Sequence, residues 1–349
     1  MKFPAEIVGR LRRHYEGRPV CVTGGAGFIG GHLVDALLSL GSAISVIDDL
    51  SNSTADHLAS LIELEADRLR FIHGSILDDD AVAEATHEAR TIFHLGAMGS
   101  VPRSVAEPQR AWSVNATGTL RILEAARRNW QGIDRAKVGA GERVVLAASS
   151  SAYGDDPSLP KIESTVPRPL SPYAASKLAG EHLLTSWAHS YGISTVSLRY
   201  FNIFGPRQPA DSAYAAVIPA FAKRLAAGVP PVIYGDGKQS RDFTAVANAV
   251  LATLLAGAVE RPLAGEVINI GTGKRTTLLE LARMMGDLMG RPNIQPEHAP
   301  PRAGDVPHSL ADITRARDLI GYAPIQTMED GLRETLAWIL REPARSDRS

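Results

Sequence analysis

Two side chains with complementary acid–base chemistry lie one helical turn apart in this chain of 349 residues. Tyr173 and Lys177 fall in a helical pattern, Pro172–Tyr191, so their i, i+4 spacing places the phenol and the ammonium on one face. A neighbouring cation favours the phenolate, and we therefore expect Lys177 to lower the pKa of Tyr173 and make it a general base. Three consecutive hydroxyls, Ser149 to Ser151, end an apolar run earlier in the chain and are candidates to work beside this pair.

A glycine-rich turn predicts a bound dinucleotide. The glycines of the pattern Gly24-x-x-Gly27-x-x-Gly30 follow an apolar run and open a helical pattern. Glycines at this spacing permit a tight turn, close approach of the backbone to a pyrophosphate and close packing of the helix, whose N-terminus faces the anion. Asp48 ends the next apolar run, roughly 20 residues on, where a carboxylate accepts the adenosine ribose hydroxyls. Because this carboxylate repels a 2′-phosphate, we expect NAD(H) rather than NADP(H).

The elements that position these residues alternate through the first two-thirds of the chain. Short apolar runs, typical of parallel strands buried on both faces, are expected to form strands at Val20–Thr23, Ala43–Ile47, Leu69–His73, Thr91–Leu95, Val144–Ala148, Ser194–Leu198 and Val267–Ile270. Helical patterns lie between them at Phe28–Leu40, Ala55–Ala66, Asp80–His87, Gln109–Asn129 and Pro172–Tyr191. This alternation predicts an α/β fold with a doubly wound (Rossmann) parallel sheet and a ligand across the carboxyl ends of its strands.

The pattern changes after Phe204, where glycine and proline interrupt it. Further elements are expected at Tyr214–Ala227, Pro231–Tyr234, Ala245–Gly257, Thr277–Gly290, Ile313–Ile320 and Met328–Leu340. We interpret them as part of a smaller C-terminal α/β substrate lobe over the carboxyl edge of the sheet. The predicted division assigns residues 1–202 and 240–273 to the NAD-binding Rossmann domain, and residues 203–239 and 274–349 to the lobe.

Composition narrows the class of protein further. A formal net charge of -1 gives no electrostatic reason to expect nucleic acid or an anionic membrane surface as a partner. No apolar run approaches the ~20 residues of a membrane helix. The histidines and acids show no grouping with metal-ligand spacing, so we expect no metal. The single cysteine, Cys21, excludes a disulfide within the chain, and we expect a cytoplasmic protein.

Taken together, these motifs resemble the extended short-chain dehydrogenases/reductases and, within them, the nucleotide-sugar 4-epimerases. The resemblance covers nearly the whole chain and rests on Thr23–Gly30, His94–Ala97, Asn115–Thr119, the serine cluster ahead of Tyr153 and Gly154, Tyr173 with Lys177, Arg199–Arg207, Gly235–Gly237, Ser240–Phe243 and Arg302–Asp305.

The resemblance implies a mechanism and two sets of binding residues. Tyr173, as phenolate, takes the proton of the sugar 4-hydroxyl while NAD+ takes hydride from C4; Lys177 binds the nicotinamide ribose, and Ser149, with Ser150, holds O4. The implied NAD-binding residues are Gly24, Gly27, Phe28, Ile29, Asp48, Asp49, Asn52, Ser53, Ser75, Ile76, Leu95, Ala97, Asn115, Tyr173, Lys177 and Tyr200. The implied substrate-binding residues are Ser100, Ser149, Asn202, Ala216, Val217, Arg241, Arg302, Asp305 and Ser309.

Four positions bear on the reaction and the sugar. Related 4,6-dehydratases carry an Asp-Glu pair where this chain has Ser150 and Ser151, and related uronate epimerases typically carry threonine where it has Asn202. A small residue at the position of Ser309 admits an N-acetyl group. The resemblance therefore implies interconversion of UDP-GlcNAc and UDP-GalNAc, with UDP-glucose and UDP-galactose as secondary substrates.

Other functions stay open from the sequence. They are a UDP-glucose or UDP-uronate 4-epimerase, a nucleotide-sugar oxidoreductase or lyase, and a non-catalytic NAD-binding regulator.

Three details complete these expectations. The family usually has aspartate where this chain has Ser75, so a serine must contact adenine or leave that contact unmade. His94 is interpreted as a core histidine. In relatives, helices corresponding to Gln109–Asn129 and Pro172–Tyr191 build a four-helix bundle, which implies a homodimer.

Overall fold

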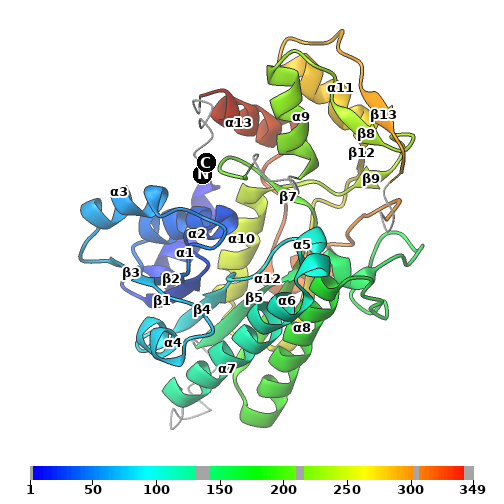
Figure 1. Ribbon diagram of the computed structural model, residues 1–349. Coiled ribbons are helices and arrows are strands. Elements are labelled where there is room, and N and C mark those ends of the chain that lie inside the picture. The colour runs from blue at the N-terminus through cyan, green and yellow to red at the C-terminus, as the bar shows by residue number, and fades with distance from the viewer. Residues whose placement is uncertain (1–2, 131–141, 210–215, 302–305, 342–349) are drawn as a thin grey trace.

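A seven-stranded parallel sheet forms the centre of the molecule in the computed structural model, which describes residues 3–130, 142–209, 216–301 and 306–341 (Figure 1). Its strand order is β3-β2-β1-β4-β5-β6-β11. The strands are β1 (Pro19–Thr23), β2 (Ala43–Asp48), β3 (Leu69–His73), β4 (Thr91–His94), β5 (Arg143–Ser149), β6 (Ser194–Tyr200) and β11 (Ala264–Ile270). The order reverses between β1 and β4, which is where doubly wound sheets bind their ligands. The predicted fold class is confirmed.

Helices cover both faces of this sheet, and two apolar clusters hold the layers together. On one face lie α1 (Ala5–Tyr15), α2 (Phe28–Ser39), α3 (Asp56–Leu64), α10 (Val246–Gly257) and α12 (Thr314–Ile320). On the other face lie α4 (Asp79–Thr86), α7 (Gly118–Asn129) and α8 (Pro172–Tyr191). Leu37 and Leu251 belong to the first cluster, and Ile122 and Leu184 to the second; all four are fully buried. Burial on both faces explains why the strands are continuously apolar.

A smaller lobe stands beside the carboxyl edge of the sheet, at the top of Figure 1. It contains α9 (Val217–Ala226), α11 (Leu278–Leu288) and α13 (Met328–Arg341), which share a third apolar cluster around Phe221, Leu281 and Leu332. Short strand pairs accompany the helices: β7 (Ile203–Phe204) with β10 (Thr244–Ala245), β8 (Val232–Tyr234) with β13 (Glu297–Ala299), and β9 (Ser240–Arg241) with β12 (Thr276–Thr277).

The lobe differs from its prediction in two ways. Residues 274–349 were all expected in it, yet Ala316 and Ile320 of α12 pack into the cluster of the large sheet. The helix expected at Tyr214–Ala227 begins at Val217, and its predicted start falls among residues 210–215, outside the described residues. The charged, glycine-containing sequence from Gln131 to Glu142 predicts a surface loop, and this segment also lies almost entirely outside the described residues.

The helix expected at Gln109–Asn129 is divided. It consists of α6 (Pro108–Trp112), a π-helical turn (Ser113–Thr117) and α7. The extra residue in such a turn redirects a side chain, and turns of this kind are frequent at functional sites. A further short helix, α5 (Val101–Ala106), precedes them; Ser100 caps it by accepting a hydrogen bond of 3.2 Å from the backbone N–H of Arg103.

Among the described residues, no helix is both long and apolar enough to cross a bilayer.

Candidate active site

A cleft of about 1060 Å³ opens at the carboxyl edge of the sheet, where the strand order reverses, and extends beneath the lobe. Most of the site residues predicted from the sequence line it. They are Gly24, Gly27, Phe28, Ile29, Asp48, Asp49, Asn52, Ser53, Ser75, Ile76, Leu95, Ala97, Ser100, Ser149, Ser150, Tyr173, Lys177, Tyr200, Asn202, Ala216, Arg241 and Ser309. The structure therefore brings together segments from every part of the chain.

The glycine turn after β1 leaves room for a ligand and none for side chains. A Cβ on Gly24, whose φ is +71°, would stand 2.7 Å from the backbone nitrogen of Gly96, and one on Gly30 would stand 2.0 Å from the carbonyl oxygen of Gly24. Helix α2 begins directly after Gly27, and no side chain caps its first N–H groups. Unpaired N–H groups at the positive end of a helix dipole suit a pyrophosphate.

The carboxylate of Asp48 stands beside this turn. It accepts hydrogen bonds from the backbone N–H of Ala26 at 3.0 Å, from that of Leu50 at 2.9 Å and from the hydroxyl of Ser53 at 3.2 Å. These bonds use only part of the acceptor capacity of a carboxylate, so Asp48 can still receive ribose hydroxyls. The turn, the helix start and this acid together fit an NAD molecule. Ser75, which also lines the cleft, accepts a bond of 3.2 Å from the N–H of Leu77.

Asn115 does not line the cleft, unlike the other predicted cofactor residues. Its side-chain oxygen accepts a bond of 2.8 Å from the N–H of Met98, and its amide donates to the carbonyl of Met98 and, at 3.0 Å, to the hydroxyl of Ser176. The π-helical turn directs this side chain at the loop after β4. Asn115 therefore shapes the wall that Ala97 and Met98 form, one layer behind the ligand.

His94 is a core histidine, as predicted, and its hydrogen bonds define its tautomer. Thr119 donates to the carbonyl of Asn115 at 2.6 Å, so its oxygen must accept the proton on Nε2 of His94 at 2.9 Å. The other nitrogen, Nδ1, then accepts from Thr23 at 2.8 Å, whose oxygen in turn accepts from the N–H of Gly96. Burial, together with the charge of Lys177, lowers the pKa of His94 to about 3. These hydrogen bonds through the neutral imidazole hold the backbone at Gly96, where the cleft wall formed by Ala97 and Met98 begins.

The hydroxyls of the site form one directed network. Ser149 Oγ accepts from the N–H of Ser151 at 3.2 Å and from its hydroxyl at 2.8 Å. Both lone pairs are then occupied, so the proton of Ser149 is directed to the phenol oxygen of Tyr173. Burial raises the pKa of Tyr173, and this hydrogen bond from Ser149 opposes the rise.

Lys177 behaves differently from its prediction. It was expected to lower the pKa of Tyr173, but burial dominates and the pKa is raised. The ammonium instead donates a bond of 2.8 Å to the carbonyl oxygen of Ala147 on β5. Burial lowers the pKa of Lys177 itself to about 8, against the opposing charge of Glu181 one turn further along α8. Two N–H donors of the ammonium remain for ribose hydroxyls in the cleft.

The lobe supplies the opposite wall. Arg241, on β9, donates hydrogen bonds to the carbonyl oxygens of Ser240 at 3.0 Å and Pro307 at 3.1 Å. Ser309 pairs with the same strand through its N–H, 3.0 Å from the carbonyl of Ser240. Val217 packs on the apolar cluster of the lobe and does not line the cleft. Arg302 and Asp305 lie outside the described residues.

Residues that the sequence reasoning did not assign also line the cleft. They include Arg103, Tyr153, Lys161, Gln208, Pro209 and His308. Arg103 donates to the side-chain oxygen of Asn52 at 2.8 Å and to Glu107 at 2.9 Å, so it bridges α5 and the loop after β2. Arg103 follows the predicted substrate-binding residue Ser100 by three positions, but no spacing rule indicates which wall of the cleft it contacts.

The tyrosine–lysine helix and the dinucleotide turn face one cleft, which suits an enzyme that moves a proton at a hydroxyl and a hydride at its carbon. A fold and site of this kind define a nicotinamide-dependent member of the short-chain dehydrogenase/reductase class. A family model, the NAD dependent epimerase/dehydratase family, matches residues 20–271. The chain belongs to this family and uses NAD.

Three relatives are similar over almost their whole lengths. The chain is 38% identical, over 90% of its length and 96% of the relative, to a UDP-glucose 4-epimerase of Mycolicibacterium smegmatis. It is 38% identical, with a TM-score of 0.84, to a UDP-N-acetylglucosamine 4-epimerase of Methanobrevibacter ruminantium in complex with UDP-N-acetylmuramic acid, covering 93% of this chain and 99% of that one. A UDP-glucose 4-epimerase of Thermus thermophilus, solved with NAD, gives 32% identity and a TM-score of 0.80, covering 93% and 100%.

Proposed function

We propose that this protein is a UDP-sugar 4-epimerase whose main substrates are UDP-GlcNAc and UDP-GalNAc. The observation that carries the proposal is the hydroxyl network of Ser149, Ser151 and Tyr173 on the cleft wall. It supplies one base and one hydrogen-bond donor at a single hydroxyl, with serines where dehydratases carry their acidic pair. The names of the similar epimerases of M. smegmatis and M. ruminantium agree with 4-epimerisation of a UDP-sugar, and only the second agrees with an N-acetylated one.

The residues of the chain divide the reaction between them. As a phenolate, which the positive charge of a bound nicotinamide would favour, Tyr173 receives the proton of the sugar 4-hydroxyl. When the sugar is bound, Ser149 donates its own proton to the same sugar oxygen instead of to the phenol. Lys177 binds the nicotinamide ribose with the donors that Ala147 leaves free. When bound, NAD+ accepts hydride from C4 and, once reduced, returns it. Tyr173 gives its proton back to the same oxygen, so the epimerised sugar leaves with no net oxidation.

Inversion requires the 4-keto sugar to present its other face before hydride returns, while the nucleotide stays bound. Arg241 suits the second task, since its guanidinium fork matches phosphate oxygens and two backbone carbonyls, of Ser240 and Pro307, already fix it. Arg302 and Asp305 are proposed to join it from the family resemblance. Asn202, with φ +39°, lines the same wall and donates a long bond of 3.4 Å to the carbonyl of Asp242.

Ser309 supports the choice of an N-acetylated sugar. It lines the cleft, and its backbone is tied to β9, so its small side chain keeps a defined place on the wall. A small residue there leaves space for an acetamido group beside C2. The runner-up is a UDP-glucose 4-epimerase, which the relatives of M. smegmatis and T. thermophilus favour by name.

Turnover without added cofactor tests the proposal. Purified protein is incubated with UDP-GlcNAc, UDP-glucose or UDP-glucuronate, and the products are separated by ion-pair chromatography. We expect UDP-GalNAc to form fastest and to reach an equilibrium with no accumulation of NADH. Accumulating NADH would identify a net dehydrogenase, loss of water would identify a dehydratase, and binding of NAD without any product would identify a regulator.

We further propose a homodimer through α7 and α8. Trp112 and Tyr191, at the ends of this helical layer, are 52% and 42% exposed and would be covered in such a dimer. A shallow pocket between α6 and the start of α8 adjoins Trp112. Light scattering after gel filtration should give twice the mass of 37.3 kDa, and Trp112→Asp should shift the protein toward the monomer.

A further inference from the structure

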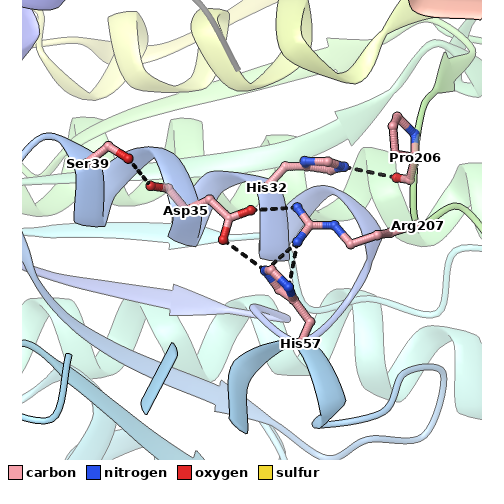
Figure 2. Close-up of polar contacts among 6 residues, drawn as sticks. All are labelled: His32, Asp35, Ser39, His57, Pro206 and Arg207. Atoms are coloured by element: carbon pink, nitrogen blue, oxygen red, sulfur yellow. Dashed lines mark hydrogen bonds and ion pairs between the residues drawn. The ribbon is translucent and has the colours of Figure 1, made fainter. Parts of the chain in front are cut away.

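A cluster of polar side chains connects a loop that lines the cleft to α2, the helix at the predicted dinucleotide turn (Figure 2). Arg207, which follows β7, contacts the carboxylate of Asp35 on α2 at 2.8 Å and the ring of His57 on α3. His57 and Asp35 contact one another at 2.9 Å, so the three side chains close a triangle. Because these partners are 172 and 150 residues from Arg207 in the sequence, the triangle joins parts of the chain that local structure cannot connect.

Opposite charges link two members of the triangle. The guanidinium of Arg207, which has only donors, contacts both ring nitrogens of His57, and Nε2 of His57 also lies 2.9 Å from a carboxylate oxygen of Asp35. Burial acts to raise the pKa of Asp35, but the bond from His57 and the charge of Arg207 outweigh it, and the pKa is lowered. Asp35 is therefore a carboxylate paired with the guanidinium.

A second contact holds Pro206, the residue before Arg207. His32, one turn before Asp35 on α2, donates from Nε2 to the carbonyl oxygen of Pro206 at 2.9 Å. Burial, with the nearby charge of Arg207, lowers the pKa of His32 to about 4, so the ring is neutral. Arg207 itself has φ +67°, a left-handed conformation that non-glycine residues adopt only where their surroundings impose it. Two consecutive residues of the loop are thus fastened to one helix.

Both ends of this attachment reach the cleft. On the loop, Ile203, Gln208 and Pro209 line it on either side of Pro206 and Arg207, which do not. On α2, Phe28 and Ile29 line it at the helix start, and the ring of Phe28 packs edge-on against His32 at 5.9 Å between centroids. The first turn of α2 therefore lines the part of the cleft predicted to hold the dinucleotide. The following turns of the same helix contact the loop of residues 203–209, which lines the cleft on the side of the lobe.

We propose that Arg207 is a positioning residue that couples the two ligands of the cleft. Through Asp35, His57 and the Pro206–His32 contact it holds the wall segment 203–209 at a fixed distance from the first turn of α2. NAD seated on α2 would then pre-order the wall that receives the sugar nucleotide, and each ligand would bind more tightly in the presence of the other. The inference rests on the proposed substrate class for its second ligand only.

Arg207→Met removes the charge and keeps much of the chain length. We expect the KM for the UDP-sugar to rise on the order of tenfold, with kcat at saturating substrate within about twofold, since Arg207 contacts no reacting atom. NAD affinity, measured by fluorescence titration with and without UDP, should lose its dependence on UDP. Arg207→Lys keeps the charge and should restore part of this dependence, and Asp35→Asn should reproduce the effect of Arg207→Met without adding to it in the double variant.

Arg70→Met is the matched control, because it removes an exposed ion pair with Glu84 on edge strand β3. It should leave KM and NAD affinity unchanged. The proposal is overturned if Arg207→Met keeps the coupling between UDP and NAD, or if it lowers the unfolding temperature and leaves KM and NAD affinity unchanged. If Arg207→Met fails to fold, the same measurements of coupling between UDP and NAD on Asp35→Asn and Arg207→Lys test the proposal. Coupling with UDP but no epimerisation by the wild type would reject the proposed function and leave this inference standing.

Discussion

The ammonium of Lys177 donates a hydrogen bond of 2.8 Å to the carbonyl oxygen of Ala147, and this contact joins α8 to the strand that carries Ser149. The lysine thereby sits at the floor of the cleft, 6% exposed. It is held where a nicotinamide ribose would lie, and it keeps Tyr173, one turn earlier on α8, above the hydroxyls that end β5.

Lys177→Met should stabilise the fold while removing activity. Folding lowers the pKa of the Lys177 ammonium from 10.5 to about 8, so the folded state binds this proton less tightly than the unfolded chain does. At about 1.36 kcal/mol per pKa unit, the protonated lysine costs the fold roughly 3 kcal/mol below pH 8. This cost is absent above about pH 10.5, where the lysine is neutral in both the folded and the unfolded state. It appears as the pH falls from 10.5 and is complete once the pH has fallen through 8. Urea unfolding should thus show the variant to be more stable at pH 7 and no more stable near pH 10.5.

Lys238→Met, at an exposed position, is the control and should change neither stability nor activity. A Lys177→Met variant that is less stable at pH 7 would mean that the bond to Ala147 outweighs the cost of burial.

Tyr173→Phe should retain NAD and lose turnover. The substitution removes the acid–base group but leaves the apolar ring and the cleft wall in place, so kcat should fall by about a hundredfold to ten-thousandfold. Bound NAD is measured by absorbance after denaturation, and turnover by chromatography. An active variant would refute the assigned base.

Ser149→Ala should slow the reaction and shift its pH dependence. Its hydrogen bond opposes the effect of burial on Tyr173, so losing it raises the pKa of Tyr173 further and moves the rising limb of the pH–rate profile to higher pH. A hydrogen bond to a charged group contributes about 1.5–3 kcal/mol, so kcat should fall roughly tenfold to a hundredfold. Ser150→Ala, which keeps this bond, should have a smaller effect and no shift of the profile.

Asn115→Ala should lower the stability of the fold rather than act on the chemical step directly. It leaves the N–H and the carbonyl of Met98 without their side-chain partner in a buried setting, which costs about 1–3 kcal/mol for each unsatisfied group. Chemical denaturation measures this loss, with Asn293→Ala at an exposed position as the control. If Asn115→Ala instead weakens NAD binding with no loss of stability, the residue contacts the cofactor as the family resemblance first implied.

Ser309→Tyr should change the choice of sugar. A phenol on this part of the wall fills the space proposed for the acetamido group, so turnover of UDP-GlcNAc should fall by more than about tenfold relative to UDP-glucose. The ratio of the two kcat/KM values is the measurement. An equal loss on both substrates would reject a gate at this position.

The local parts of the site were predictable because short-range chemistry determines them. A glycine turn between a strand and a helix, an acid at the end of β2, and a phenol and an ammonium on one helical face each follow from spacing within one element. The sheet followed in the same way, since strands buried on both faces must be continuously apolar. These features sufficed to predict the fold class and the cofactor, and they indicated Tyr173 and Lys177 as candidate reacting residues, both of which line the cleft.

The tertiary structure decided what depends on groups far apart in the chain. The pKa of Tyr173 is raised because burial sums over neighbours from many segments, and one lysine a turn away does not offset it. Asn115 lies behind the wall because a π-helical turn directs it to Met98. Arg207 was part of a recognised motif, but its partners Asp35 and His57 belong to helices near the other end of the chain. Spacing along a sequence carries no information about such pairings, which only the packed layers of the fold create.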